Sequence, residues 1–96
     1  MRHKSKALQD VEDHPESSTG LGPDVDKKFR ERMFLIRNAP DERDFYALKS
    51  LHYEKLKGKR AHQRSMRLNK QYRLILEIET DLAGKLVAVI SVEDYH

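Results

Sequence analysis

The spacing of apolar residues changes from a helical period to a strand period near the middle of the chain. In the first half, Val25, Phe29, Met33 and Ile36 recur at intervals of four, four and three, which places them on one face of an α-helix. From Tyr72 onward apolar and polar residues alternate, as in strands. Helices that precede strands, instead of alternating with them, predict an α+β domain with helices packed on an antiparallel sheet.

Prolines, acids and small residues mark where the helices begin and end. Proline suits a first helical turn, Asp24 and Asp26 favour the positive end of the helix dipole, and Pro40 prevents continuation. The expected elements are a short helix at Lys6–Asp13, a loop at 16–23, a main helix from Pro23 or Asp24 to Asn38, and a short helix at 41–48.

The second half predicts three antiparallel strands joined as a meander. We expect strands at 65–69, 72–79 and 85–92, with turns at 69–71 and 80–84. Alternation puts Arg73 on the more polar face of the second strand, while the β-branched run 86–90 suits a central strand covered on both faces. The length allows one compact domain, residues 1–96, with a twisted antiparallel sheet of three to four strands.

Positive charge is concentrated in one segment. From His52 to Arg73 eight cations oppose the single acid Glu54, a formal charge of +7 in a chain whose net charge is +3. Such a strip suits phosphate backbones, although a solvated lysine-rich face is an open alternative. We call these cations the basic strip: Lys55, Lys57, Lys59, Arg60, Arg64, Arg67, Lys70 and Arg73.

Composition and missing motifs exclude several classes of function. The chain has no cysteine, no glycine-rich phosphate loop and no nucleophile-elbow serine. A zinc site is disfavoured because no histidine stands at a helical ligand spacing from a second ligand. No apolar run suggests a secretory signal or a membrane span, so we expect a cytoplasmic protein without a metal or another cofactor.

The last half of the chain resembles the HigB branch of the RelE/ParE toxin superfamily. The resemblance rests on a Leu-Lys-Gly-x-Arg element, a strand ending in Tyr-Arg, and a final Asp-Tyr-His. These motifs lie in Leu51–Arg60, Ser65–Leu74 and Glu93–His96. The helical half matches in layout only, and the first strand of such proteins is here expected to be short or missing.

The resemblance implies a RelE-like fold and a ribosome-dependent messenger-RNA endonuclease. In such toxins the ribose 2′-hydroxyl attacks the neighbouring phosphate, so the protein must move protons and stabilise an anion. The implied catalytic residues are His96 as general acid or base, Tyr95, Arg73 on the phosphate, Asp94, Lys57 and, less closely aligned, His52. The implied RNA- or ribosome-binding residues are Lys55, Lys59, Arg60, Arg64, Arg67 and Lys70.

The resemblance also implies partners. We expect a HigA-like antitoxin with a helix-turn-helix domain, the ribosome with its messenger RNA, no membrane, and operator DNA only through the antitoxin. Two other functions stay open: a ParE-like toxin that inhibits DNA gyrase, and a non-catalytic basic domain that docks on RNA. Among the site residues, Arg73 can instead pair with Glu77 or Glu79, Lys57 can be solvated, and Asp-Tyr-His can be an ordinary chain end.

Overall fold

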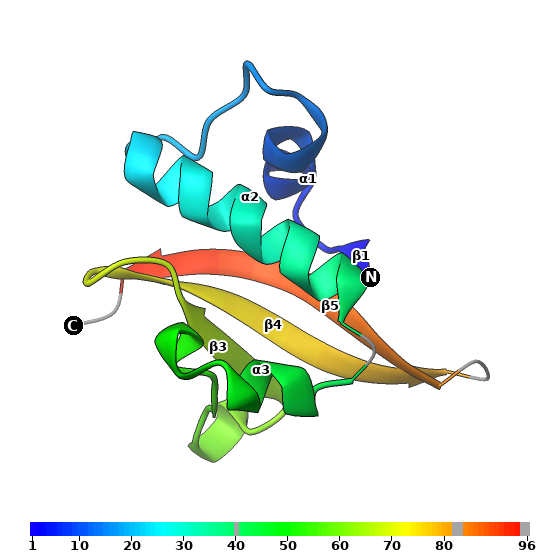
Figure 1. The fold of residues 1–96 in the computed structure, drawn as a ribbon. Helices are drawn as coiled ribbons and strands as arrows, with labels where there is room; N and C mark the ends of the chain where they lie inside the picture. Colours follow the sequence, from blue (N-terminus) through cyan, green and yellow to red (C-terminus); the bar gives the residue numbers. More distant parts are fainter. Residues whose placement is uncertain (40, 82–83, 95–96) are drawn as a thin grey trace.

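The computed structural model describes residues 1–39, 41–81 and 84–94. Three α-helices precede most of the sheet, and two short 3-10 helices lie in the connections (Figure 1). The helices are α1 Lys6–Asp13, α2 Pro23–Asn38 and α3 Arg43–Ala47, with η1 Lys49–Leu51 and η2 Gly58–Arg60. The strands are β1 Arg2–His3, β2 Glu54–Lys55, β3 Gln63–Arg67, β4 Tyr72–Asp81 and β5 Gly84–Asp94.

The two longer helices have the bounds expected from the sequence, because local signals set them. The Ser5 hydroxyl accepts a hydrogen bond from the Leu8 amide at 3.3 Å and caps α1. Pro23 opens α2 with acids in its first turn, and α2 ends at Asn38, before the expected stop at Pro40, which lies outside the described residues. The short third helix is confirmed within its expected range.

The sheet has five strands in the order β1-β5-β4-β3-β2. The α+β fold and the antiparallel meander β3-β4-β5 are confirmed; β4 and β5 are longer than expected, β3 begins two residues earlier, and residues 82 and 83 of the second turn lie outside the described residues. The sheet has five strands where three to four were expected, and one of its pairings is parallel. Strand β1 pairs with β5 in parallel and β2 adds an antiparallel edge, and neither two-residue strand has a period that a sequence can reveal.

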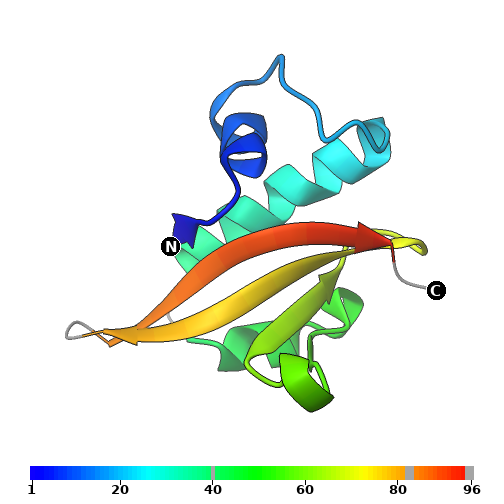
Figure 2. The same cartoon turned by 180° about the vertical axis from the view of Figure 1, so that it is seen from behind.

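Helix α2 covers one face of the sheet, and Figure 2 shows β5 passing in front of it. One buried cluster joins the apolar stripe of α2 to the inward residues of the strands, among them Met66, Leu74, Leu76 and Val89. In β5, Ala88 and Val89 are fully buried, as its apolar run predicts. The opposite face has no α-helix among the described residues, although η2 approaches it through Arg60, which pairs with Glu93 of β5.

Candidate active site

The face of the sheet away from the helices is defined by strand register. We call it the open face; its central residues are Ser65 of β3, Arg73 and Ile75 of β4, and Ser91 and Glu93 of β5. Ser65, Ile75 and Ser91 lie side by side across the three strands, and Arg73 lies opposite Glu93. A bulge between Ile75 and Leu76 shifts the register, so that both Ser91 and Ala88 share this face.

Neighbouring groups hold Arg73 in place on the open face. Its Nε donates to the Oγ of the fully buried Ser65 at 3.0 Å, and its Nη2 donates to the carbonyl oxygen of His52. The carboxylate of Glu54 lies 3.7 Å from Nη2. Only 12% of the Arg73 side chain is exposed. The guanidinium is therefore preorganised, because neighbouring groups hold its plane before any ligand arrives.

His52 lies beside Arg73 in a strained backbone conformation. Its φ of 46° is in the left-handed region, where it ends η1 and directs its carbonyl oxygen to Arg73. The ring is exposed, and its Nε2 lies 3.3 Å from Nη1 of Arg67. Arginine can only donate, so a hydrogen bond between these two atoms requires Nε2 of His52 as the acceptor.

A pocket of about 340 Å³ opens where these side chains meet. It is lined by His52, Arg67, Asn69, Lys70 and Arg73, and we call it the β-turn pocket. The turn between β3 and β4 is held in shape by Asn69, whose Oδ1 accepts from the amides of Gln71 and Tyr72 at 2.9 and 2.8 Å. Three cations and a histidine facing one cavity suit an anionic ligand.

Helix α2 supports the same turn from the covered side. Nε and Nη2 of Arg32 donate to the carbonyl oxygen of Arg67 at 3.2 and 3.1 Å, and burial lowers the pKa of Arg32 from its ordinary value. Asn69 donates to the carboxylate of Asp24 at 2.9 Å, which lowers the pKa of Asp24. The pocket is therefore built on rigid elements.

A second pocket, of about 430 Å³, lies on the other side of Glu54. It is lined by Glu54, Lys55, Leu56, Lys57 and Arg60, and we call it the loop pocket. Lys55 and Lys57 are exposed there, and Lys59 is exposed in η2. Glu54 lines this pocket and also approaches Arg73, so the pair Glu54–Arg73 lies between the two pockets.

Two arginines of the basic strip are held by carboxylates. Arg60 forms a two-pronged ion pair with Glu93, at 3.0 and 2.7 Å, which lowers the pKa of Glu93. Arg64 lies opposite Leu76 and therefore on the helix-covered face, where its Nε donates to Glu42 at 3.0 Å. The same Glu42 oxygen accepts from the hydroxyl of Tyr53, whose pKa is raised by burial and by this carboxylate.

The end of β5 carries the remaining expected catalytic residues. Register places Asp94 opposite Tyr72, on the face away from Arg73, and the Asp94 carboxylate accepts from Nε2 of Gln71 at 3.0 Å. Tyr95 and His96 lie outside the described residues. The structure thus brings His52, Arg67, Lys70 and Arg73 together, with Lys55 and Lys57 across Glu54.

Sequence reasoning missed Ser65, Glu54 and Asn69 as parts of this site. Alternation did place Ser65 on the face of Arg73, so that its partnership with a cation could have been suspected. Glu54 is the one acid of the basic segment, but nothing in the sequence gives its distance to Arg73. Within the described ranges, no cluster of three histidine or acidic side chains is arranged to hold a metal ion.

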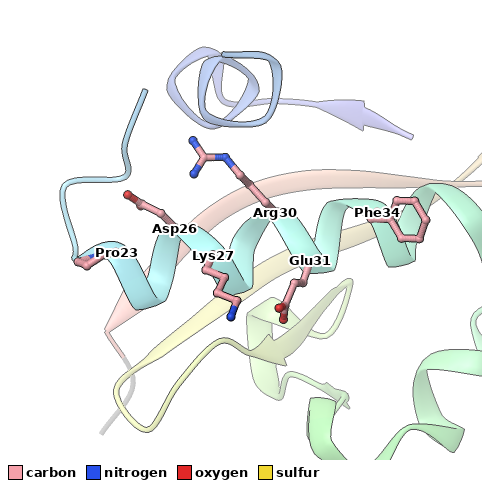
Figure 3. Close-up of a pocket in the computed structure, with 6 residues that line it drawn as sticks. All are labelled: Pro23, Asp26, Lys27, Arg30, Glu31 and Phe34. Carbon is pink, nitrogen blue, oxygen red and sulfur yellow. The ribbon is translucent and has the colours of Figure 1, made fainter. Parts of the chain in front are cut away.

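A further hollow lies away from the open face, along the outer side of α2 (Figure 3). It measures about 650 Å³, and Phe34 at its end is 72% exposed. Figure 3 shows Arg30 directed toward α1 and Lys27 directed to the other side of the helix.

None of the helices that the structure describes is long and apolar enough to cross a membrane.

Comparison with known proteins agrees with the fold. Residues 2–95 match the family model described as the RelE-like toxin of type II toxin–antitoxin system HigB. The solved YoeB/ParE toxin from Agrobacterium tumefaciens superposes with a TM-score of 0.57 at 15% identity, covering 98% of this chain and 95% of that chain. At that identity the likeness shows the fold alone. A comparison with curated protein sequences gives no match. The family match spans nearly the whole chain, and the protein therefore belongs to the HigB-like family of RelE-like toxins.

Proposed function

We propose that this toxin is an endoribonuclease that cleaves messenger RNA on the ribosome and so inhibits translation. The observation that carries the proposal is the fixed Arg73 guanidinium between two cation-lined pockets on the open face. A bound phosphodiester would meet a guanidinium that neighbouring groups already hold in place, with cations on both sides for the neighbouring phosphates. Such a groove suits a single strand held by its backbone.

The proposed chemistry uses the 2′-hydroxyl of the RNA as nucleophile. A base removes the hydroxyl proton, the oxygen attacks the adjacent phosphorus, and the bond to the 5′ oxygen breaks as an acid protonates that oxygen. The products are a 2′,3′-cyclic phosphate and a 5′-hydroxyl end. Arg73 and Lys57 stabilise the pentavalent anion, which carries more charge than the substrate.

Proton transfer is assigned to the histidines. His52 lines the β-turn pocket, with its Nε2 3.3 Å from Nη1 of Arg67, and we assign it a role in proton transfer once RNA replaces that contact. We assign His96 the complementary acid or base role, with Tyr95 stacking on a base and Asp94 orienting a histidine. Glu54 fits a further role, since a carboxylate 3.7 Å from Arg73 offsets the guanidinium charge until a phosphate displaces it.

Partners follow from the family and from this chemistry. A type II toxin implies a cognate antitoxin, which we propose to be a HigA-like protein with a helix-turn-helix domain. Operator DNA would then be bound only through the antitoxin complex. Ribosome-bound messenger RNA places the site of action in the cytoplasm. Lys55, Lys59, Arg67 and Lys70 are the exposed or pocket-lining cations that we assign to RNA or ribosome contact.

The experiment is regulated expression of the wild-type chain, Arg73→Lys and His96→Ala, with growth followed and messenger-RNA ends mapped by primer extension. Lysine keeps the charge of Arg73 but loses the planar fork, so we expect cleavage to fall roughly 10²-fold, the size of a lost preorganised donor. New RNA ends within translated frames, absent from His96→Ala, support the proposal. Growth arrest by all three chains without new RNA ends would contradict it and favour gyrase inhibition or simple docking.

A further inference from the structure

We propose that Arg60 is a positioning residue, which holds the end of β5 against the η2 loop and thereby aligns the two sides of the site. The inference rests on the proposed nuclease function. It departs from the expectation that Arg60 contacts RNA, because the guanidinium already has specific partners within the fold.

The contacts of Arg60 form a clamp across the open face. Nη1 and Nη2 meet the two carboxylate oxygens of Glu93 at 3.0 and 2.7 Å, and Nε donates to Oε1 of Gln63 at 2.8 Å. Ser91 adds a hydrogen bond to Glu93 at 3.2 Å. All three guanidinium nitrogens thus face β3 or β5, in the planar geometry that lysine cannot reproduce.

Both ends of this clamp are attached to proposed functional residues. Arg60 closes η2, the turn that carries Lys59 and directly follows Lys57. Glu93 precedes Asp94, Tyr95 and His96 in the chain. Gln63 extends the network to Glu77 of β4 at 3.4 Å, so the clamp spans three strands. Holding η2 and the end of β5 in fixed positions serves catalysis, since a displacement of about 1 Å can lower a rate 10²-fold.

Variants of the two partners separate positioning from RNA contact. If Arg60 contacts RNA, Glu93→Gln frees it and tightens binding. If Arg60 positions β5, Glu93→Gln has the same effect as Arg60→Gln. The exchanged pair Arg60→Glu/Glu93→Arg restores the ion pair but puts an acid where RNA contact would need a cation. Lys59→Gln removes the cation that directly precedes Arg60 and is the control variant for a loss of RNA binding.

The assay is single-turnover cleavage of a defined messenger RNA on translating ribosomes, across toxin concentrations. We expect Arg60→Gln and Glu93→Gln each to lower the plateau rate about tenfold, with the half-saturating concentration changed less than twofold, and the exchanged pair to recover most of the loss. Lys59→Gln should instead raise the half-saturating concentration. A normal plateau rate in Glu93→Gln, with a binding defect in Arg60→Gln, overturns the proposal.

Amide hydrogen exchange of the same variants distinguishes failure of the clamp from failure of the nuclease proposal. The clamp requires faster exchange at the paired amides of Arg73 and residue 93 in both single variants and recovery in the exchanged pair. Absence of cleavage by the wild-type toxin rejects the nuclease function and with it a catalytic use of the clamp. Unchanged exchange in variants whose thermal unfolding is normal rejects the clamp itself.

Discussion

Ser65 is a fully buried hydroxyl on the open face, and the Arg73 guanidinium covers it. A buried hydroxyl without a partner costs free energy, so Ser65 and Arg73 stabilise each other's placement. The His52 carbonyl oxygen adds a second acceptor from a residue in the left-handed region. At the residue scale, the site is thus an arginine whose guanidinium donates to neutral acceptors and lies 3.7 Å from the carboxylate of Glu54.

Arg64 is the cation whose role changes most once its face of the sheet is known. Its side chain is 18% exposed and shares the Glu42 carboxylate with Tyr53. We predict that Arg64→Ala lowers the free energy of unfolding by about 1–3 kcal/mol, because Glu42 loses a charged partner in a place with little water. Urea unfolding measures this loss.

The matched control for Arg64→Ala is Lys70→Ala, which removes an exposed cation of the β-turn pocket. It should leave the free energy of unfolding within about 0.5 kcal/mol of wild type. It should also reduce the salt dependence of RNA binding by roughly one phosphate contact, whereas Arg64→Ala should not. A lower salt dependence in Arg64→Ala with normal stability would return Arg64 to the RNA-binding set.

Helix α2 separates an inner face that supports the sheet from an outer face that is free for other contacts. Phe29 is fully buried in the core cluster, while Phe34 is 72% exposed. We predict that Phe29→Ala lowers the free energy of unfolding by about 3–5 kcal/mol through loss of contacts and a residual cavity. Phe34→Ala removes the same atoms and should change it by less than about 0.5 kcal/mol. Equal losses in chemical denaturation would contradict this orientation of α2.

Glu12 joins three elements and gives the fold a dependence on pH. Arg37 of α2 donates to both Glu12 oxygens at 2.6 and 2.7 Å and holds the pKa of Glu12 below its ordinary value of 4.5; His3 of β1 lies 2.7 Å away. A carboxyl with a lowered folded pKa contributes stability above its unfolded pKa and loses it as the pH falls through the folded value. Wild type should therefore lose more stability than Glu12→Gln between pH 6 and pH 3.

The control for this pH dependence is Glu16→Gln, which removes an exposed carboxylate from the loop after α1. Its unfolding free energy should follow the wild-type pH profile across the same range. Parallel profiles for wild type and Glu12→Gln, measured by thermal unfolding at each pH, would show that the Arg37–Glu12 pair does not link α1 to α2.

Over the whole molecule, the sequence predicted what local signals control. The bounds of α1 and α2 follow from a serine cap, prolines and apolar spacing, and the β3-β4-β5 meander follows from alternation. Strands β1 and β2 have two residues each and form by pairing with a neighbouring strand. Two residues are too few to show the alternation that predicts a strand. The same limit applies to the candidate site, since distance and register decide which cations line the same pocket.

Charge in the basic strip is accordingly divided between two tasks. Arg60 and Arg64 pair with carboxylates and hold the sheet and helices together, while Arg67, Lys70 and Arg73 meet in the β-turn pocket. A count of cations along the chain gives the field that attracts an anionic partner, but not the residues that bind it. This division is a property of the folded molecule.

The measurement that tests the central claim most directly uses purified toxin, a defined messenger RNA, and purified translating ribosomes. We predict cleavage only when the RNA is on the ribosome, with 2′,3′-cyclic phosphate and 5′-hydroxyl ends, and about a 10²-fold lower rate for Arg73→Lys. Intact messenger RNA on ribosomes, with a wild-type toxin that inhibits DNA gyrase in a parallel supercoiling assay, would contradict the nuclease account.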